Sequence, residues 1–435
     1  MKFVFKIGFI LGSILLVILI SSFFQMIQSQ NQMYSTVMNI SPTNESHIFT
    51  GPPIKVGVLH SLTGTMAISE KPVSDITIFA IDEINQKGGV LGRKIIPIIE
   101  NGQSDPSIFA EKAENLITKE HVSAVFGGWT SASRKTMKPI FEEYNNLLFY
   151  PVQYEGLESS PNIVYTGAAP NQQVIPAVDW AYKNLGKKFF LVGSDYVFPK
   201  SANTIMKFRI QELGGKVMGE EYRKLGDTYF KGIVSKIKET HPDVILNTLN
   251  GDSNISFFRE LRNQGISSES IPTISFSIGE PEIKDIGVNL VEGDYAAWNY
   301  FQSLSNPQNE QFLEAFKKKY GDQPVSDPME SAYISVYVFA LAVEKAGTDD
   351  SNAVHNSVKG ITFLAPEGVV GVDPETQHLY KIVRIGKIMS NGQFSIISSS
   401  ELPIKPIPYP SYMPQEKWNR FLNDLYVGWG NKWSN

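Results

Sequence analysis

The chain has 435 residues, of which 42% are hydrophobic, and a formal net charge of -5. This length can bury the cores of two lobes, and the acidic balance offers no basic stripe for a phosphate backbone, which excludes nucleic acid as a partner. Cysteine is absent and the six histidines are scattered without metal-ligand spacing, so disulfides and thiolate sites are excluded and no metal or cofactor is expected.

The N-terminus carries a membrane-targeting pattern. Lys2 and Lys6 precede an uncharged apolar run from Ile7 to Phe24, and no small-residue cleavage site follows it. We expect residues 1–30 to form an uncleaved membrane anchor, with a cleaved signal segment as the alternative, and residues 31–53 to form a polar linker. The lysines should stay inside the cell, which places the remainder at the cell exterior or in the periplasm.

From residue 54 onward, strand and helix patterns alternate with a period of about 30 residues, as in a parallel sheet covered on both faces. The expected strands are 54–59, 93–100, 122–128, 145–151, 188–193, 216–222, 243–248 and 272–276. The expected helices are 71–86, 106–119, 133–144, 199–213, 229–240, 254–264, 310–319 and 331–345. Two further strands are expected within 376–397, around the turn signal Ser390-Asn391-Gly392.

This alternation of strands and helices predicts an α/β fold of two doubly wound, parallel-sheet lobes joined by a hinge. Lobe 1 is expected to comprise residues 54–170 and 299–365, and lobe 2 residues 171–298 and 366–405. Residues 406–435 form a proline-rich segment followed by a helix, whose aromatic stripe should pack on the body of the protein.

The most informative stretch is 122–156, which predicts a strand, a loop, a helix, a second strand and a second loop. The two parallel strands should end side by side, where small ligands settle in open α/β sheets. Trp129 and Ser131 follow the first strand, and Tyr150 and Tyr154 follow the second. Aromatic faces, hydroxyls and free backbone amides therefore converge without a nucleophile and base pair beside them.

Other strands also end in polar residues. Each lobe contributes such ends, and they should face one another across the hinge. The additional candidates for ligand contact are His60, Ser61, Tyr196, Asp252, Ser277, Glu280 and Trp298. Arg134 and Lys135 are expected on a solvated helix face. The chain lacks a P-loop, a G-x-S-x-G elbow and a histidine cluster, which indicates that it is not an enzyme.

Six segments carry a resemblance to a known family. The segment INQKGGVLGRK at 84–94 resembles the branched-chain amino-acid type solute-binding proteins of ABC transporters. The segments GVLHSLTGTMAISE (57–70), FYPVQYEG (149–156), GSDYVFP (193–199), TLNGDSN (248–254) and AAWNYF (296–301) resemble the urea-binding subfamily of its amide and urea branch. The resemblance spans nearly all of the chain from residue 54 and implies a type I periplasmic binding protein fold.

The resemblance also implies a ligand site. In related amide binders the pocket is lined by residues that correspond here to Trp129, Ser131, Tyr150 and Tyr196. This chain departs from them at Val152 and Phe198, where the amide binders carry hydroxyl groups, and the urea-like pattern supplies Asp252. The implied partners are an ABC permease and its ATPase.

Urea is planar and neutral, with four N–H donors and one carbonyl, so its site must be rich in acceptors. Asp252, Glu280, Tyr150 and Tyr196 could accept its hydrogens, Ser131 could donate to its carbonyl, and Trp129 or Trp298 could cover its plane. The alternatives are a short-chain amide or a branched-chain amino acid as ligand, a ligand-sensing receptor, and, from a different class, an enzyme.

Overall fold

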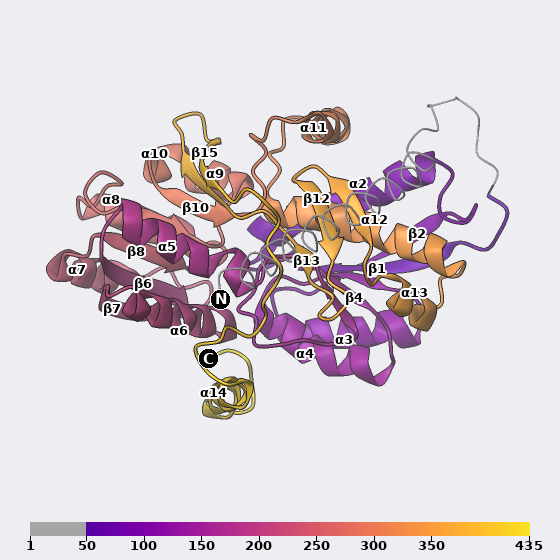
Figure 1. Ribbon diagram of the computed structural model, residues 1–435, viewed down its shortest axis with the longest axis horizontal. Coiled ribbons are helices and arrows are strands. Elements are labelled where there is room, and N and C mark those ends of the chain that lie inside the picture. Colours follow the sequence, from indigo (N-terminus) through magenta and orange to yellow (C-terminus); the bar gives the residue numbers. More distant parts are fainter. Residues whose placement is uncertain (1–48) are drawn as a thin grey trace, which may run out of the picture.

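The computed structural model describes residues 49–435, which form two α/β lobes side by side (Figure 1). The expected anchor at 1–30 and most of the linker lie outside this range. Within residues 49–435 no helix is both long and apolar enough to cross a bilayer.

Lobe 1 is built on a parallel five-stranded sheet in the order β2-β1-β3-β4-β5. Strand β1, which lies between β2 and β3, is buried at every position except Lys55, which is the pattern of a parallel strand covered on both faces. The strands are β1 (Ile54–His60), β2 (Ile95–Asn101), β3 (Val125–Gly127), β4 (Leu148–Tyr150) and β5 (Ile163–Tyr165). The helices of this lobe are α2 (Ala67–Gln86), α3 (Pro106–Thr118), α4 (Ser131–Glu143), α11 (Pro307–Tyr320), α12 (Asp327–Ala346) and α13 (Ser351–Ser357).

Lobe 2 is built on a seven-stranded sheet in the order β15-β14-β10-β9-β8-β6-β7, in which only β14 and β15 run antiparallel to their neighbours. Its strands are β6 (Lys188–Ser194), β7 (Lys216–Arg223), β8 (Val244–Thr248), β9 (Thr273–Ser275), β10 (Tyr295–Trp298), β14 (Arg384–Ile388) and β15 (Phe394–Ser399). Its helices are η1 (Pro170–Gln172), α5 (Val174–Asn184), α6 (Val197–Glu212), α7 (Lys231–Thr240), α8 (Ser253–Asn263), α9 (Glu280–Ile286) and α10 (Val288–Val291).

The boundary expected between residues 365 and 366 falls inside a hairpin. Strands β11 (Thr362–Ala365), β12 (Gly368–Val372) and β13 (Leu379–Tyr380) form a small antiparallel sheet. Its buried side chains, including Phe363, Val370 and Leu379, belong to the core of lobe 1. The structure therefore carries lobe 1 on to about residue 380, because the hairpin has its apolar face on α12.

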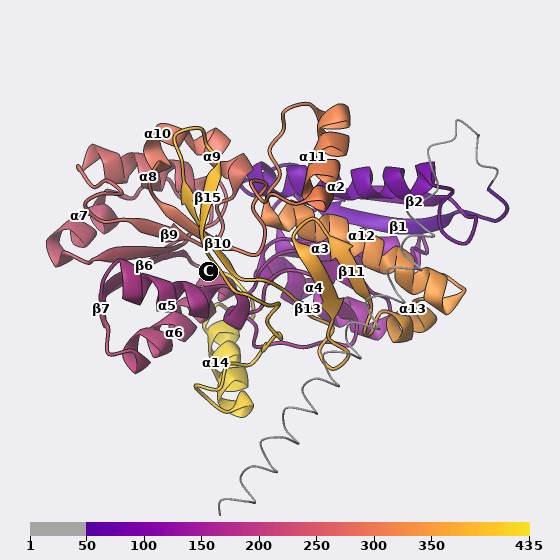
Figure 2. The ribbon, with the colours of Figure 1, turned by 45° about the horizontal axis from the view of Figure 1, so that its top comes forward.

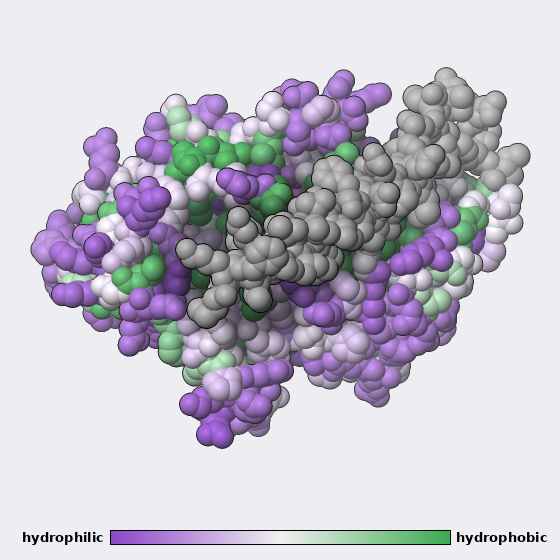
Figure 3. Space-filling view, viewed as in Figure 1, coloured by the Kyte–Doolittle hydropathy of each residue, from purple (hydrophilic) through white to green (hydrophobic). Residues whose placement is uncertain are grey.

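Local signals explain where helices begin. Asp105 accepts from Ser107 N (2.7 Å) at the start of α3, and Thr130 accepts from Ser133 N (3.1 Å) at the start of α4. The outer helices α7 and α11 bury one apolar face each and expose hydrophilic residues (Figure 3). The strand and helix alternation expected from the sequence is thus confirmed.

The lobes are joined where the chain passes between them, after β5, after β10 and after β13. Asn299 connects these crossings, because its Nδ2 donates to Gln172 O (3.1 Å) and to Ile382 O (2.9 Å). Asp327, at the start of α12, accepts from the backbone N–H groups of Asn299 and Tyr300, both at 2.8 Å. One carboxylate and one amide therefore hold the hinge strands together.

The C-terminal helix α14 (Gln415–Gly428) lies beneath lobe 2 beside α6 (Figure 2). Trp418 is fully buried and its Nε1 donates to Pro410 O (2.9 Å), so the helix packs on the body as expected. Beyond it, Val197 N donates to Trp433 O (3.0 Å), and the Lys135 ammonium of lobe 1 lies 5.1 Å from the Trp433 ring. The C-terminal tail thus contacts both lobes.

Close packing of β1 and β3 generates a prediction about Gly127. A Cβ atom there would lie 1.9 Å from Leu59 O, whereas one at Gly232 in α7 would meet nothing within 4 Å. We expect Gly127→Ala to lower the free energy of unfolding by about 1–3 kcal/mol. We expect Gly232→Ala, in the first turn of α7, to raise it by up to about 0.5–1 kcal/mol, because alanine loses less backbone entropy than glycine on entering a helix. Thermal unfolding of the two variants checks this, and equal effects would contradict it.

Candidate functional site

The loops after the strands of lobe 1 meet those of lobe 2 in direct hydrogen bonds. Trp129 Nε1 donates to Asn250 Oδ1 (3.0 Å). Thr65 Oγ1 donates to Asp252 Oδ1, and Asp252 N donates to Thr65 O (3.3 Å). Gln153 Nε2 donates to Ser277 Oγ (3.2 Å). The predicted residues Trp129, Asp252 and Ser277 therefore lie where the two lobes touch.

Trp129 and Tyr150 are held together inside lobe 1. Tyr150 ends β4, is completely buried, and donates its hydroxyl to Trp129 O. Ser131 occupies the first turn of α4, where it donates to Glu155 and accepts from Arg134 Nη1 (2.9 Å). The Ser131 hydroxyl is thus engaged by protein groups, with one donor and one acceptor already in place.

A buried cluster of charges supports these residues. Arg134 is fully buried and donates to Glu155 Oε1 (3.1 Å) and Glu158 Oε1 (2.9 Å), while Lys135 pairs with Glu158 Oε2 (2.8 Å). The guanidinium also lies 4.7 Å from the centre of the Tyr150 ring. The expectation that Arg134 and Lys135 occupy a solvated helix face was wrong, because acids on the loop after β4 draw both inward.

The cluster perturbs the acid–base chemistry of its members. Burial alone would raise the pKa of Glu158, but the neighbouring Arg134 and Lys135 charges outweigh it and hold the pKa far below its usual range. Burial raises the pKa of Tyr150 well above its ordinary value, so its phenol stays protonated. Tyr150 therefore acts as a hydrogen-bond donor.

The end of β1 contributes a further carboxylate. Glu70, in the first turn of α2, accepts from Ser61 N (2.8 Å), and its Oε2 lies 3.6 Å from Nδ1 of the buried His60. Both ring nitrogens of His60 lack a hydrogen-bond partner among the described residues. The predicted residues His60 and Ser61 thus position an acid that the site prediction did not include.

Tyr196 faces this group from lobe 2. It precedes α6, and only 2% of its surface is exposed. Burial, together with the lobe 1 groups Tyr150 and Glu155, raises the pKa of its phenol, and Glu70 adds to the effect. Groups of lobe 1 therefore act on the hydroxyl of this lobe 2 side chain, as expected for a residue between the lobes.

Two predicted residues are placed elsewhere, and a third lies behind the lobe 1 wall. Tyr154 packs edge to face on Tyr150, with ring centroids 6.4 Å apart, and donates to Glu158 O (3.1 Å). Trp298 donates to Ile278 O (2.7 Å) in the core of lobe 2. Glu280 accepts from Gln302 N (2.9 Å) on the side of the hinge. No described hydrogen bond or ring contact joins Tyr154, Trp298 or Glu280 to Trp129 or Asp252.

Several residues of the site were missed by sequence reasoning. Glu70 and Glu155 are the last acids of two quoted segments, 57–70 and 149–156, so the segments marked the region without marking these side chains. Asn250 follows β8 in the segment that yielded Asp252. Nothing in the local sequence distinguishes an acid that faces a cleft from one that caps a helix, since both follow strand ends.

Two doubly wound lobes, a hinge of three crossings and facing polar loops define a two-lobed solute-binding protein. Residues 54–415 match the family model described as the periplasmic binding protein domain, and the chain belongs to that family. Its fold is the expected type I periplasmic binding protein fold. Members of this family act outside the cytoplasmic membrane, and this protein is a binding protein rather than an enzyme.

Named relatives agree with this assignment. The chain is 25% identical over 348 residues to a Leu/Ile/Val-binding protein homolog of Brucella melitensis, covering 77% of this chain and 87% of the relative. It is 25% identical to the leucine-, isoleucine-, valine-, threonine-, and alanine-binding protein of Pseudomonas aeruginosa, covering 75% of this chain and 88% of that protein.

Among solved structures, a solute-binding protein of an ABC transporter from Rhodopseudomonas palustris, in complex with p-hydroxybenzoic acid, is similar in fold. Its TM-score is 0.74 at 24% identity, covering 81% of this chain and 98% of that one. LivJ of Streptococcus pneumoniae, in complex with isoleucine, gives a TM-score of 0.71 at 22% identity, with 81% and 100% covered.

The buried charge cluster predicts a pH-dependent stability. Glu158→Gln leaves Arg134 and Lys135 short of a carboxylate, and we expect a loss of about 3–5 kcal/mol in the free energy of unfolding at pH 7. Because the pKa of Glu158 lies below its ordinary 4.5 in the folded state, its contribution is complete above pH 4.5 and is lost as the pH falls further. The gap between wild type and variant should therefore narrow at pH 3.

Thermal unfolding at pH 7 and pH 3 measures this gap. The matched control is Glu143→Gln, an exposed acid at the end of α4, the helix that carries Arg134 and Lys135, which should change stability by less than about 0.5 kcal/mol. A Glu158→Gln variant as stable as the control at pH 7 would contradict the structural role of the cluster.

Proposed function

We propose that this protein is the extracytoplasmic receptor of an ABC transporter and that it binds urea between its lobes. It presents the ligand to a permease driven by an ATPase, and the N-terminal segment 1–30 holds it at the cytoplasmic membrane. The class rests on family membership, and urea rests on the resemblance of the segments around the site and on the chemistry of the side chains there.

The observation that carries urea is the excess of acceptors between the lobes. Glu70 and Asp252 bring carboxylates from opposite lobes, and Tyr196 adds a hydroxyl. Urea presents four N–H donors, each of which would cost about 1–3 kcal/mol if it were buried without a partner. Carboxylates are the stronger acceptors, which matters for a ligand with so few atoms. Tyr150 and Trp129 supply a flat apolar boundary behind them.

The basic side chains beside the site are already neutralised. Arg134 and Lys135 are each paired with Glu155 and Glu158, at distances between 2.8 and 3.8 Å. A zwitterionic amino acid needs donors for its carboxylate as well as acceptors for its ammonium group. The site therefore offers more free acceptors than free cationic groups, and this favours a neutral ligand with many N–H donors over an amino acid.

A branched-chain amino acid is the second candidate. The observation that favours it is the name of the relatives, since the Pseudomonas aeruginosa protein is a binder of leucine, isoleucine, valine, threonine and alanine. Backbone N–H groups at the start of α4 are the kind of donor that an amino-acid carboxylate accepts. If the ligand is an amino acid, these backbone N–H groups must bind its carboxylate in place of a free cationic side chain.

Calorimetric titration of the full-length protein with urea, acetamide and leucine separates the candidates. We expect saturable binding of urea with a dissociation constant of tens of micromolar or tighter, about the limit set by four heavy atoms. Leucine should neither bind nor displace urea. Saturable binding of leucine without any heat from urea would establish the amino-acid reading instead.

A substitution at Asp252 tests the acceptor argument. Asp252→Asn keeps an oxygen for the hydroxyl of Thr65 but removes the charge, and we expect urea affinity to fall by about tenfold. Asp424→Asn, an exposed acid on α14, is the matched control and should leave affinity unchanged. Calorimetry on both variants decides the point, and equal affinities would remove Asp252 from the site.

A further inference from the structure

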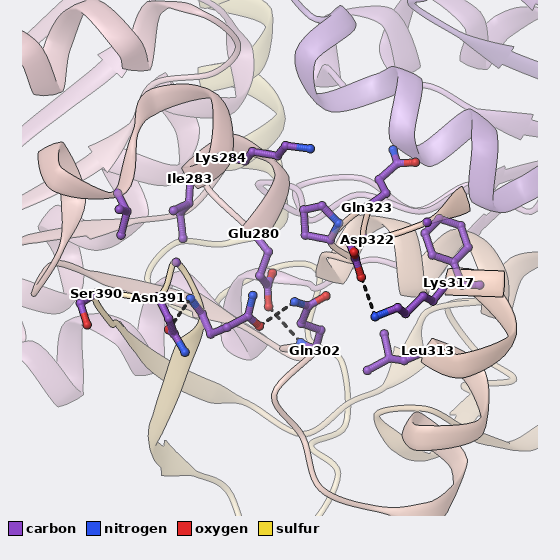
Figure 4. A pocket seen from close by; sticks show the side chains of 16 residues that line it. Glu280, Ile283, Lys284, Gln302, Leu313, Lys317, Asp322, Gln323, Ser390 and Asn391 are labelled. Carbon is purple, nitrogen blue, oxygen red and sulfur yellow. Dashed lines mark hydrogen bonds and ion pairs between the residues drawn. The ribbon is translucent and has the colours of Figure 1, made fainter. Parts of the chain in front are cut away.

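A cavity lies outside the candidate site, on the side of α9 and α11. Its volume is about 720 Å³. One wall comes from lobe 2, from α9 and the turn between β14 and β15, and the other from lobe 1, from α11 and the loop before α12 (Figure 4). Ile283 and Val288 on one side and Leu313 and Phe316 on the other give each wall an apolar part among polar and charged lining residues.

Glu280 lies at the floor of this cavity and is incompletely bonded. It is 2% exposed, and its Oε1 accepts from Gln302 N (2.9 Å). Its Oε2 has no hydrogen-bond partner among the described residues. Figure 4 shows the carboxyl between the side chains of the two walls. Buried carboxyl oxygens are normally satisfied, so this one is available to a ligand.

The charges around Glu280 are of its own sign. Burial raises its pKa to about 8, the N–H of Gln302 opposes this, and the neighbouring acids Glu282 and Asp327 reinforce it. Among the cations at the rim, Lys317 is paired with Asp322 (2.6 Å) and Lys284 is exposed to solvent. Neither is within ion-pairing distance of Glu280. The floor of the cavity therefore lacks a positively charged group that could pair with Glu280.

We propose that this cavity binds a small organic cation, an ammonium or amidinium group carrying a short apolar portion. The cation donates to Oε2 of Glu280, and the apolar portion lies between Ile283 of lobe 2 and Leu313 and Phe316 of lobe 1. Because the walls belong to different lobes, the occupant contacts both lobes at a place separate from Trp129 and Asp252. Glu280, which the sequence predicted to contact urea, is therefore assigned to this cavity instead.

Binding of n-butylammonium to the full-length protein tests the proposal, with 1-butanol as the neutral probe of similar shape. We expect calorimetry to show saturable binding of n-butylammonium and none of 1-butanol. Measured above pH 8, where Glu280 is ionised, Glu280→Gln should weaken binding of the cation by about tenfold or more, because it removes the carboxylate that accepts the N–H groups of the cation. Glu314→Gln, an exposed acid on α11 that does not line the cavity, is the matched control and should retain wild-type affinity for the cation.

Chemical-shift mapping on the wild-type protein provides a test that does not depend on how the variants fold. In amide NMR spectra, n-butylammonium should shift Gly321 and Gly392, which line the cavity, and leave Gly128 and Gly251 at the interlobe loops unmoved. Equal binding by Glu280→Gln and wild type, loss only in Glu314→Gln, shifts confined to Gly128 and Gly251, or no binding at millimolar concentration would overturn the proposal. Urea affinity in Glu280→Gln separates this site from the proposed function, since it should be unchanged.

Discussion

The pairing of Arg134 with Glu155 and Glu158 is the interaction on which the candidate site depends. A guanidinium with no exposed surface is tolerated only when its charge and its N–H groups are met, and here two carboxylates from one loop meet them. The pairing fixes the loop after β4 against the first turn of α4. Ser131 is bonded within the same network, and Tyr150 lies against the guanidinium face, so the geometry of the lobe 1 wall follows from it.

Closure of the lobes depends on a different set of contacts. Hydrogen bonds of Trp129 to Asn250 and of Gln153 to Ser277 join the facing loops, whereas Asn299 and Asp327 tie the hinge strands together. Such an arrangement keeps the hinge intact while the loops separate, which is how two-lobed receptors admit a ligand. The wall around Arg134 is rigid by comparison, so a ligand first binds to a preformed surface on lobe 1, and lobe 2 then closes on it.

Much of the fold was predictable because its long elements carry strong periodic signals. The buried strand β1 and the helices α2, α6 and α12 were located from apolar spacing, within a few residues at their ends. Short elements escaped, since the three residues of β5 and the hairpin of β11 and β12 have no periodicity of their own and depend on their neighbours. The boundary of lobe 1 was misplaced for the same reason.

Topology was enough to predict which residues lie between the lobes, but the direction of a side chain was not predictable from the sequence. Trp129 and Asp252 follow strands that end at the interface, so strand order alone brings them together. Trp298 also ends a strand, but its indole turns into the core of lobe 2. The burial of Arg134 depends on acids more than 20 residues away, which no helix-face argument includes.

The central claim is that the two lobes close around a neutral ligand whose hydrogens are accepted by side chains of both. A crystal structure of the protein grown with urea tests it most directly. The account predicts urea between Trp129 and Tyr196, with its N–H groups within hydrogen-bonding distance of Glu70 and Asp252. Urea bound away from these four side chains, or a leucine retained there in its place, would contradict it.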